Sequence, residues 1–117
     1  SRSSAASDVY KRQHLTIGPD AEDNIRKYYV DKCITSVSGI DPDVGCYAAI
    51  PSEASMKRTL VSHSRETILL VDSSKFNRKA FCLAFDLSDV SIVVTDSDTP
   101  KDEIEKLRDR GITVYVV

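Results

Sequence analysis

The sequence has few of the residues from which metal sites and disulfide frameworks are built. It contains two histidines, His14 and His63, and three cysteines, Cys33, Cys46 and Cys82, with no C-x-x-C pair. A zinc site therefore has little support, and buried, reduced thiols of a cytoplasmic protein are expected. No run is long or apolar enough to span a bilayer, and no signal-peptide pattern opens the chain. We expect a cytoplasmic protein without membrane contact.

The sequence also lacks an excess of basic charge and the common phosphate-binding and catalytic motifs. The formal net charge of −2 argues against a nucleic-acid-binding face in this chain, because phosphate contacts need clustered Lys and Arg. Loops of the G-x-G-x-x-G or Walker type, G-x-S-x-G elbows and H-E-x-x-H sites do not occur. We therefore expect no cofactor and no metal ion. Asp41, Glu53 or Asp72 could serve acid–base chemistry, but their spacing selects none of them.

What is present fits one domain preceded by a foreign tail. The chain has 117 residues, of which 41% are hydrophobic and 29% charged, as expected for a single soluble domain. Residues 1–13 are polar and without hydrophobic periodicity, and Asp8–Gln13 resembles the translation of a sequencing adapter. We expect residues 1–13 to be a non-native or disordered adapter-like tail. The natural protein is expected to extend upstream of His14.

Short apolar segments alternate with helical patterns along the rest of the chain. Pro19 and Pro100 are each expected in the first turn of a helix, and another helix is expected to start at Pro51-Ser52-Glu53. Ser52 and Thr99 are the expected N-caps of the last two helices. Strands alternating with helices predict a parallel sheet with helices on its faces. The expected strands cover residues 14–17, 32–37, 67–71, 81–85, 91–96 and 113–117, and a loop is expected over 38–45.

Two helices and one helix end carry more specific expectations. Ala21, Ile25 and either Tyr28 or Tyr29 would form the apolar face of the first helix. Ile104 and Leu107 would form the inward face of the last helix, and Gly111 is placed where a left-handed residue would end it.

The central strand, Thr67–Val71, is followed directly by Asp72, Ser73, Ser74 and Lys75. In open α/β sheets, ligands bind beyond the carboxyl ends of the strands. An ammonium and two hydroxyls at that position could hold an anionic, oxygen-rich ligand. The alternative is an ordinary polar turn with Lys75 in solvent.

Two further groups belong to the same hypothesis. The segment 38–41 follows a neighbouring strand and would open toward the same rim of a parallel sheet. Glu53 and Lys57 lie four residues apart on one helix, where they could close this rim or form an ordinary surface ion pair.

The ordered series of motifs resembles the C-terminal sensor domain of DeoR-type bacterial transcriptional repressors. The similarity runs almost without a gap from Ile17 to Val117. The motifs that carry it are Ile17-Gly18-Pro19, Asp31-Lys32, Ser38-Gly39-Ile40-Asp41, Glu53-x-x-x-Lys57-Arg58, Asp72-Ser73-Ser74-Lys75-Phe76 and Val94-Thr95-Asp96.

The resemblance implies an α/β, Rossmann-like, mostly parallel sheet with helices on both faces, related to ribose-phosphate isomerases, glucosamine-phosphate deaminases and CoA transferases. Residues 14–117 would then be the C-terminal part of a domain that senses a phosphorylated sugar or a related metabolite. Operator DNA would be bound only by an N-terminal domain that this chain does not contain. The intact repressor would be a homo-oligomer.

The resemblance also implies residue roles at the site. Lys75 would hold a phosphate or sugar oxygen and Asp72 would orient it, with Ser73 and Ser74 beside them. Ser38, Gly39 and Asp41 would line the sugar side, and Glu53 and Lys57 would close the rim or pair structurally.

The family's loop often has Asp or Asn where this chain has Ser38. Since a serine is a poor general base, the resemblance implies a protein that is not an enzyme. The alternative is a sugar-phosphate isomerase or deaminase on the same fold.

Overall fold

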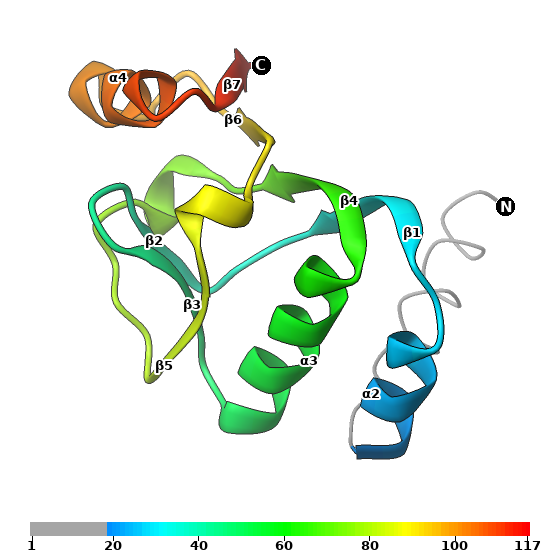
Figure 1. Ribbon diagram of the computed structural model, residues 1–117. Helices are drawn as coiled ribbons and strands as arrows, with labels where there is room; N and C mark the ends of the chain where they lie inside the picture. The colour runs from blue at the N-terminus through cyan, green and yellow to red at the C-terminus, as the bar shows by residue number, and fades with distance from the viewer. Residues whose placement is uncertain (1–18) are drawn as a thin grey trace, which may run out of the picture.

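The computed structural model describes residues 19–117 as one α/β unit with two sheets (Figure 1). The strand predicted at His14–Ile17 lies outside the described residues. In chain order the elements are α2 (Pro19–Arg26), β1 (Val30–Thr35), β2 (Gly39–Asp41), β3 (Gly45–Ala48), α3 (Pro51–Ser62), β4 (Ser64–Leu70), the 3₁₀ turn η1 (Ser73–Lys75), β5 (Cys82–Asp86), the 3₁₀ turn η2 (Leu87–Asp89), β6 (Ile92–Thr95), α4 (Lys101–Asp109) and β7 (Thr113–Val116).

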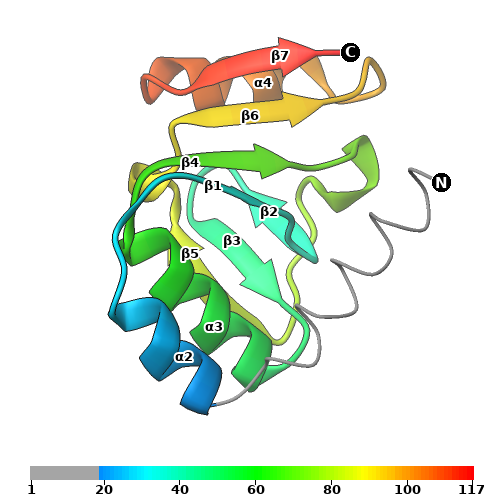
Figure 2. The ribbon, with the colours of Figure 1, turned by 90° about the vertical axis from the view of Figure 1, so that its right-hand side faces the viewer.

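The larger sheet contains the strands in the order β1-β4-β6-β7, and all its neighbours are parallel, which confirms the predicted sheet type (Figure 2). Each successive strand is added at the same edge of this sheet. Right-handed crossovers therefore place all the connecting segments on one face of the sheet. Val61 of α3 and Leu107 of α4 both pack in the core on that face, and α2 lies beside α3. The helices on the second face that the resemblance implies are not formed by residues 19–117.

The second face of this sheet carries large apolar side chains that remain exposed. Ile34, Leu70 and Tyr115 are 63%, 48% and 55% exposed. In the strand register, Leu70 pairs with Val94 and Val94 pairs with Tyr115, so these side chains lie on one face. Ile34 pairs with Ile68, which lies on the same face as Leu70 because the two are two residues apart in β4. A parallel sheet is normally covered on both sides. The exposed face is therefore an unusual feature of the described chain.

The smaller sheet, β2-β3-β5, is antiparallel and was not predicted. The segment expected to be a loop, Ser38–Gly45, instead supplies β2, a turn and the start of β3. The turn is stabilised locally, because the Asp43 N–H donates to Asp41 Oδ1 (2.9 Å) and the Val44 N–H donates to the Asp41 carbonyl (3.0 Å). The expected loop was wrong because Gly39–Asp41 pairs with β3 across this turn, and β3 pairs in turn with β5, about forty residues later.

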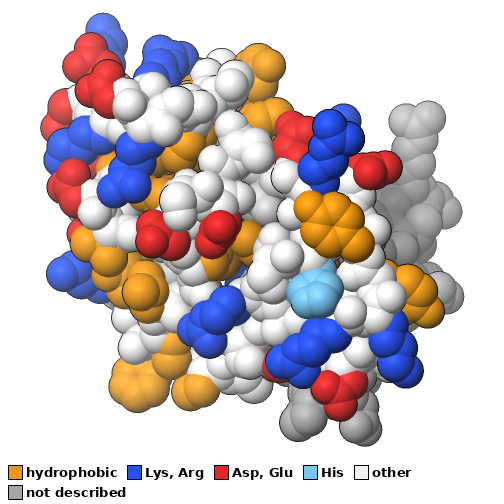
Figure 3. Space-filling model, viewed as in Figure 1, with side chains coloured by type: hydrophobic (Ala, Val, Ile, Leu, Met, Phe, Trp, Pro, Cys, Tyr) orange, Lys and Arg blue, Asp and Glu red, His pale blue; other side chains and the backbone are white. Residues whose placement is uncertain are grey.

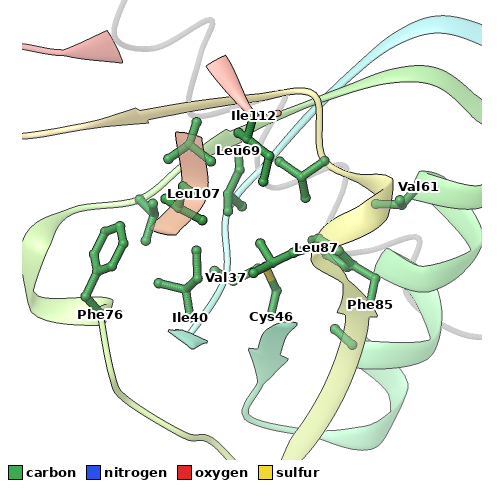
Figure 4. Packing of buried hydrophobic residues seen from close by; sticks show 14 of the residues in the cluster. Val37, Ile40, Cys46, Val61, Leu69, Phe76, Phe85, Leu87, Leu107 and Ile112 are labelled. Atoms are coloured by element: carbon green, nitrogen blue, oxygen red, sulfur yellow. The ribbon is translucent and has the colours of Figure 1, made fainter. Parts of the chain in front are cut away.

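The core lies between the two sheets, α3 and α4 (Figure 4). Side chains from every one of these layers meet there, and each fully buried aliphatic side chain contributes on the order of 2 kcal/mol to folding. The labelled members are Val37, Ile40, Cys46, Val61, Leu69, Phe76, Phe85, Leu87, Leu107 and Ile112.

Several details of the helices differ from expectation. The N-cap residue of α3 is Ile50 rather than Ser52, since Pro51 already occupies the first helical position. Helix α4 begins at Lys101, and Thr99 does not cap it: its hydroxyl bonds to that of Thr95 at 2.7 Å in a buried position. Tyr28 and Tyr29 are exposed and lie beyond the end of α2. Local sequence predicted the helices well, whereas side-chain partners depended on the surrounding fold.

Two expectations about the last unit are confirmed. Ile104 and Leu107 are buried on the inner side of α4, and Gly111 has the left-handed φ of +87° that ends the helix. Within the described residues, none of the helices combines the length and the apolarity that crossing a membrane would need.

Candidate functional site

The turn that follows β4 is built around the carboxylate of Asp72. The Ser74 N–H donates to Asp72 Oδ1 at 2.9 Å, and the Ser74 hydroxyl donates to the same oxygen. These bonds cap the 3₁₀ turn Ser73–Lys75 and favour the ionised carboxylate. The hydroxyl and N–H of Ser74 thereby lower the pKa of Asp72. Asp72 and Ser74 shape the turn.

Asp96, at the carboxyl end of the neighbouring strand β6, holds the other amide of this turn. The Ser73 N–H donates to Asp96 Oδ2 at 2.8 Å, and the Asp98 N–H donates to Asp96 Oδ1 at 2.9 Å. Bonding to the Ser73 N–H is the largest cause of the lowered pKa of Asp96. Because the Ser73 and Ser74 amides are bonded to carboxylates and the Lys75 amide to the Asp72 carbonyl, an anion at this site would have to be held by side chains. Asp96 was not among the predicted site residues, although its position at a strand end was recognised.

Lys75 is the one cation of the turn. Its side chain is half-buried, and among residues 19–117 it makes no ion pair within 4.0 Å. The Lys75 N–H donates to the Asp72 carbonyl at 3.1 Å, which completes the turn. The backbone of Lys75 is thus used by the turn, whereas its side-chain ammonium is the group that could bind a ligand. An ammonium and a serine hydroxyl in one turn are groups suited to a phosphate or carboxylate oxygen.

The second wall of the site is β2, which follows β1 by four residues. Ile40 forms a parallel bridge with Phe76, and the Asn77 N–H donates to the Ile40 carbonyl at 2.8 Å. Gly39 lies against the Arg78 backbone, where a Cβ on Gly39 would stand 2.0 Å from the Arg78 carbonyl oxygen. Residues Gly39 and Ile40 of β2 therefore contact Phe76–Arg78, the segment that directly follows the Asp72–Lys75 turn.

Several polar groups of this second wall already form hydrogen bonds within the smaller sheet and its turn. Ser38 is half-buried, and its N–H donates to the Tyr47 carbonyl at 2.9 Å. The Asp41 carboxylate accepts from the Asp43 N–H in the hairpin turn. Gly39 has no side chain, so only its backbone could contact a ligand.

Glu53 and Lys57 are an ion pair on α3, with 4.0 Å between Lys57 Nζ and Glu53 Oε1. The Lys57 side chain is only 15% exposed, and its ammonium donates to the Ser36 carbonyl just past the end of β1. Burial lowers the pKa of Lys57, while Glu53 acts in the opposite direction. In residues 19–117 no hydrogen bond or ion pair joins this pair to Asp72–Lys75. The arrangement favours a structural pair over a second anion-binding group.

Asn77 and Glu103 join the turn to α4, and sequence reasoning missed both. Asn77 has a left-handed φ of +55°, and its Nδ2 donates to Glu103 Oε1 at 2.8 Å. Asparagine tolerates this backbone better than most residues, which was the available signal. Among the described residues no group of three or more His, Cys, Asp and Glu side chains is arranged to hold a metal ion.

A parallel α/β sheet with polar residues gathered at its carboxyl rim defines a Rossmann-like domain with a candidate ligand site. The family follows from comparison with known proteins. Residues 4–97 match the DeoR C terminal sensor domain family, so the chain belongs to that family, and the resemblance seen in the motif series is confirmed.

The curated relatives named here are bacterial proteins described as transcriptional regulators or repressors. The chain is 33% identical over 100 residues to the uncharacterized HTH-type transcriptional regulator YulB of Bacillus subtilis (86% of this chain, 39% of the relative). It is 32% identical over 108 residues to the glycerol-3-phosphate regulon repressor of Escherichia coli K12 (92% and 43%), and 30% identical over 100 residues to a putative aga operon transcriptional repressor of Escherichia coli O157:H7 (86% and 37%). The chain thus spans about two fifths of the length of these relatives.

Proposed function

We propose that this chain is the effector-sensing part of a DeoR-type transcriptional regulator and that it binds a phosphorylated sugar or a related metabolite. The observation that carries the proposal is the position of Lys75. Lys75 follows the central strand of a parallel sheet and directly precedes Phe76, which bridges to Ile40 of β2. Its ammonium makes no ion pair within 4.0 Å among the described residues. Lys75 and the Ser73 hydroxyl bind phosphate, and the Ser38–Asp41 segment faces the sugar.

The remaining predicted site residues have supporting roles. Asp72 and Ser74 hold the turn that carries Lys75, as their mutual hydrogen bonds support. Glu53 and Lys57 brace the end of β1 rather than contact the effector, which the burial of Lys57 and its bond to Ser36 support.

The regulatory part of the proposal concerns the whole protein. Effector binding here weakens operator binding by an N-terminal domain outside this chain, as two sites coupled through differential affinity. The names of the relatives support the regulatory role. On the face shown in Figure 3, basic and acidic side chains are mixed over α4, which supports assigning DNA contact to another part of the protein. The whole protein acts in the cytoplasm as a homo-oligomer, and the division into a tail (1–13) and a sensor portion (14–117) is part of the proposal.

We also infer that the chain has no catalytic activity. An isomerase or deaminase would need a general base at the loop after Val37, where Ser38 stands. The nearest acid of that loop, Asp41, has its carboxylate engaged by the Asp43 N–H. Isomerisation of ribose 5-phosphate or deamination of glucosamine 6-phosphate by this chain, lost on Asp41→Asn, would contradict the inference.

Calorimetric titration tests the binding site directly. The probes are sn-glycerol 3-phosphate, glucose 6-phosphate and fructose 6-phosphate, with inorganic phosphate as the minimal anion. We expect at least one sugar phosphate to bind, and Lys75→Ala to weaken it about tenfold or more, the cost of one charged hydrogen bond. Lys79→Ala, an exposed lysine of the same loop, is the matched control and should leave the affinity unchanged. Equal losses in the two variants would refute the site.

A further inference from the structure

Glu103 is a buried carboxylate that is only half satisfied. The residue is 4% exposed, although it lies in the first turn of a helix whose other acidic residues face solvent. Its Oε1 accepts from Asn77 Nδ2 at 2.8 Å and lies 3.9 Å from Lys106 Nζ, whereas Oε2 has no partner among the described residues. Buried polar atoms are almost always paired, so retaining a carboxylate here calls for a reason beyond packing.

The partner of Glu103 is the residue that joins the two walls of the candidate site. Asn77 follows the Asp72–Phe76 turn, and its N–H donates to the Ile40 carbonyl in β2 at 2.8 Å. It makes this bond from a left-handed backbone, with φ of +55°, which glycine adopts freely and asparagine at a smaller cost than other residues. The bond from its side chain to Glu103 holds Asn77 in that conformation.

The same helix also holds the far end of the β2 wall. Lys106 Nζ lies 3.3 Å from Asp43 Oδ2 in the β2–β3 turn. Arg110, just past the end of α4, donates from Nε to the Pro42 carbonyl at 2.9 Å and from Nη2 to the Asp43 carbonyl at 3.1 Å. Helix α4 is therefore attached to the Lys75 side of the site through Glu103 and to the β2 side through Lys106 and Arg110.

We propose that Glu103 is a positioning residue, which acts through Asn77 to set the spacing between the Asp72–Lys75 turn and β2. It contacts no ligand itself. By fixing that spacing it sets the affinity of the rim for a phosphorylated metabolite, and it makes α4 the element displaced when the spacing changes. The part of this proposal that concerns affinity rests on the proposed function, whereas the part that concerns spacing does not.

Amide hydrogen exchange, followed residue by residue by NMR on this 117-residue chain without ligand, tests the spacing. Glu103→Ala should speed exchange of the Asn77 amide about tenfold or more, the effect of losing one buried side-chain hydrogen bond. Glu103→Gln, which keeps an acceptor for Asn77 Nδ2, should restore protection. Glu105→Ala, the same change at an exposed position of α4, is the control and should have no effect.

Three outcomes would overturn the positioning role. The first is an Asn77 amide unaffected by Glu103→Ala. The second is acceleration spread equally over α4 and β6, which marks a merely structural carboxylate. The third is failure of Glu103→Gln to protect the amide. A double mutant gives an independent check: in an Asn77→Ala background, Glu103→Ala should add no further acceleration at residue 77, and full additivity would contradict action through Asn77.

Titration with sn-glycerol 3-phosphate, glucose 6-phosphate and fructose 6-phosphate then tests affinity. Glu103→Ala should weaken the bound sugar phosphate about tenfold, with recovery in Glu103→Gln. If the unmodified chain binds none of these probes, the proposed function fails, while the exchange result still decides whether Glu103 sets the spacing. If the chain binds one of them and Glu103→Ala binds it equally well, the role of Glu103 in affinity is refuted and the proposed function stands.

Discussion

Gly39 and the Arg78 carbonyl are in backbone contact, with no room for a side chain between them: a Cβ on Gly39 would lie 2.0 Å from the Arg78 oxygen. This contact closes the space between β2 and the segment that follows the Asp72–Lys75 turn. The spacing of the two walls of the candidate site therefore depends on a glycine, and the requirement is for close approach rather than for unusual backbone torsion.

Gly39→Ala should consequently destabilise the protein by about 2 kcal/mol or more, because the two segments must move apart and strain their hydrogen bonds. The free energy of unfolding in urea, monitored by circular dichroism, measures this. Gly111→Ala is the comparison: its Cβ would enter open space, so only the left-handed backbone, at about 1 kcal/mol, opposes it. Equal stability of Gly39→Ala and the unmodified protein would show that the two walls are not in fixed contact.

Lys57 should behave as a structural residue. Its stem is buried, and its ammonium donates to the Ser36 carbonyl, so Lys57→Ala should lower the free energy of unfolding by about 1–3 kcal/mol. Lys101→Ala, at an exposed lysine at the start of α4, should change it by no more than about 0.5 kcal/mol. A Lys57→Ala variant as stable as Lys101→Ala would assign the lysine to another role, and the same variants in the sugar-phosphate titration would identify it.

Acid should loosen the turn that carries Lys75. The pKa values of Asp72 and Asp96 are lowered in the folded protein by their hydrogen bonds to the turn. Folding therefore favours the ionised carboxylates, and this stabilisation is complete above the ordinary aspartate pKa of about 4. It is lost as the pH falls below that value, through the lowered pKa values, since protonation removes the acceptors.

Urea midpoints between pH 7 and pH 2.5 test this dependence. Asp72→Asn and Asp96→Asn should each show a flatter decline in stability below about pH 4 than the unmodified protein. Asp109→Asn, an exposed aspartate in the last turn of α4, is the control and should follow the unmodified curve. Identical slopes in all four proteins would mean that the two carboxylates do not hold the turn in solution.

The three thiols should differ sharply in reactivity. Burial raises the pKa of Cys46 to about 12 and also raises that of Cys33, so neither forms thiolate readily in the folded protein. Cys82 is only half-buried. Ellman's reagent at pH 8 should therefore label one thiol quickly and the other two only after unfolding. Cys82→Ser should abolish the fast phase, and a fast phase that persists would contradict the burial of the other two.

The unit from Ile92 to Val117 shows what was predictable from sequence. A β-branched run, a helix with Ile104 and Leu107 on one side, and Gly111 at the helix end led to the strand, helix and strand observed. Each of these signals arises from neighbours within about four residues. The segment Ser38–Gly45 shows the opposite case, because two glycines and a proline indicated a loop, whereas Gly39–Asp41 pairs with β3 and β3 pairs in turn with β5, about forty residues later.

The candidate site divides in the same way. The sequence by itself determined that a polar segment, Asp72–Lys75, stands at the end of a strand. The apolar run stops at Val71, and Asp72 can cap the turn that follows it. The tertiary structure alone decided that Asp96 holds Ser73, that Glu103 holds Asn77 and that Gly39 meets Arg78. The physical reason is that periodicity and capping act within one turn of chain. Contacts between residues 23 to 39 positions apart depend instead on how the strands and helices pack.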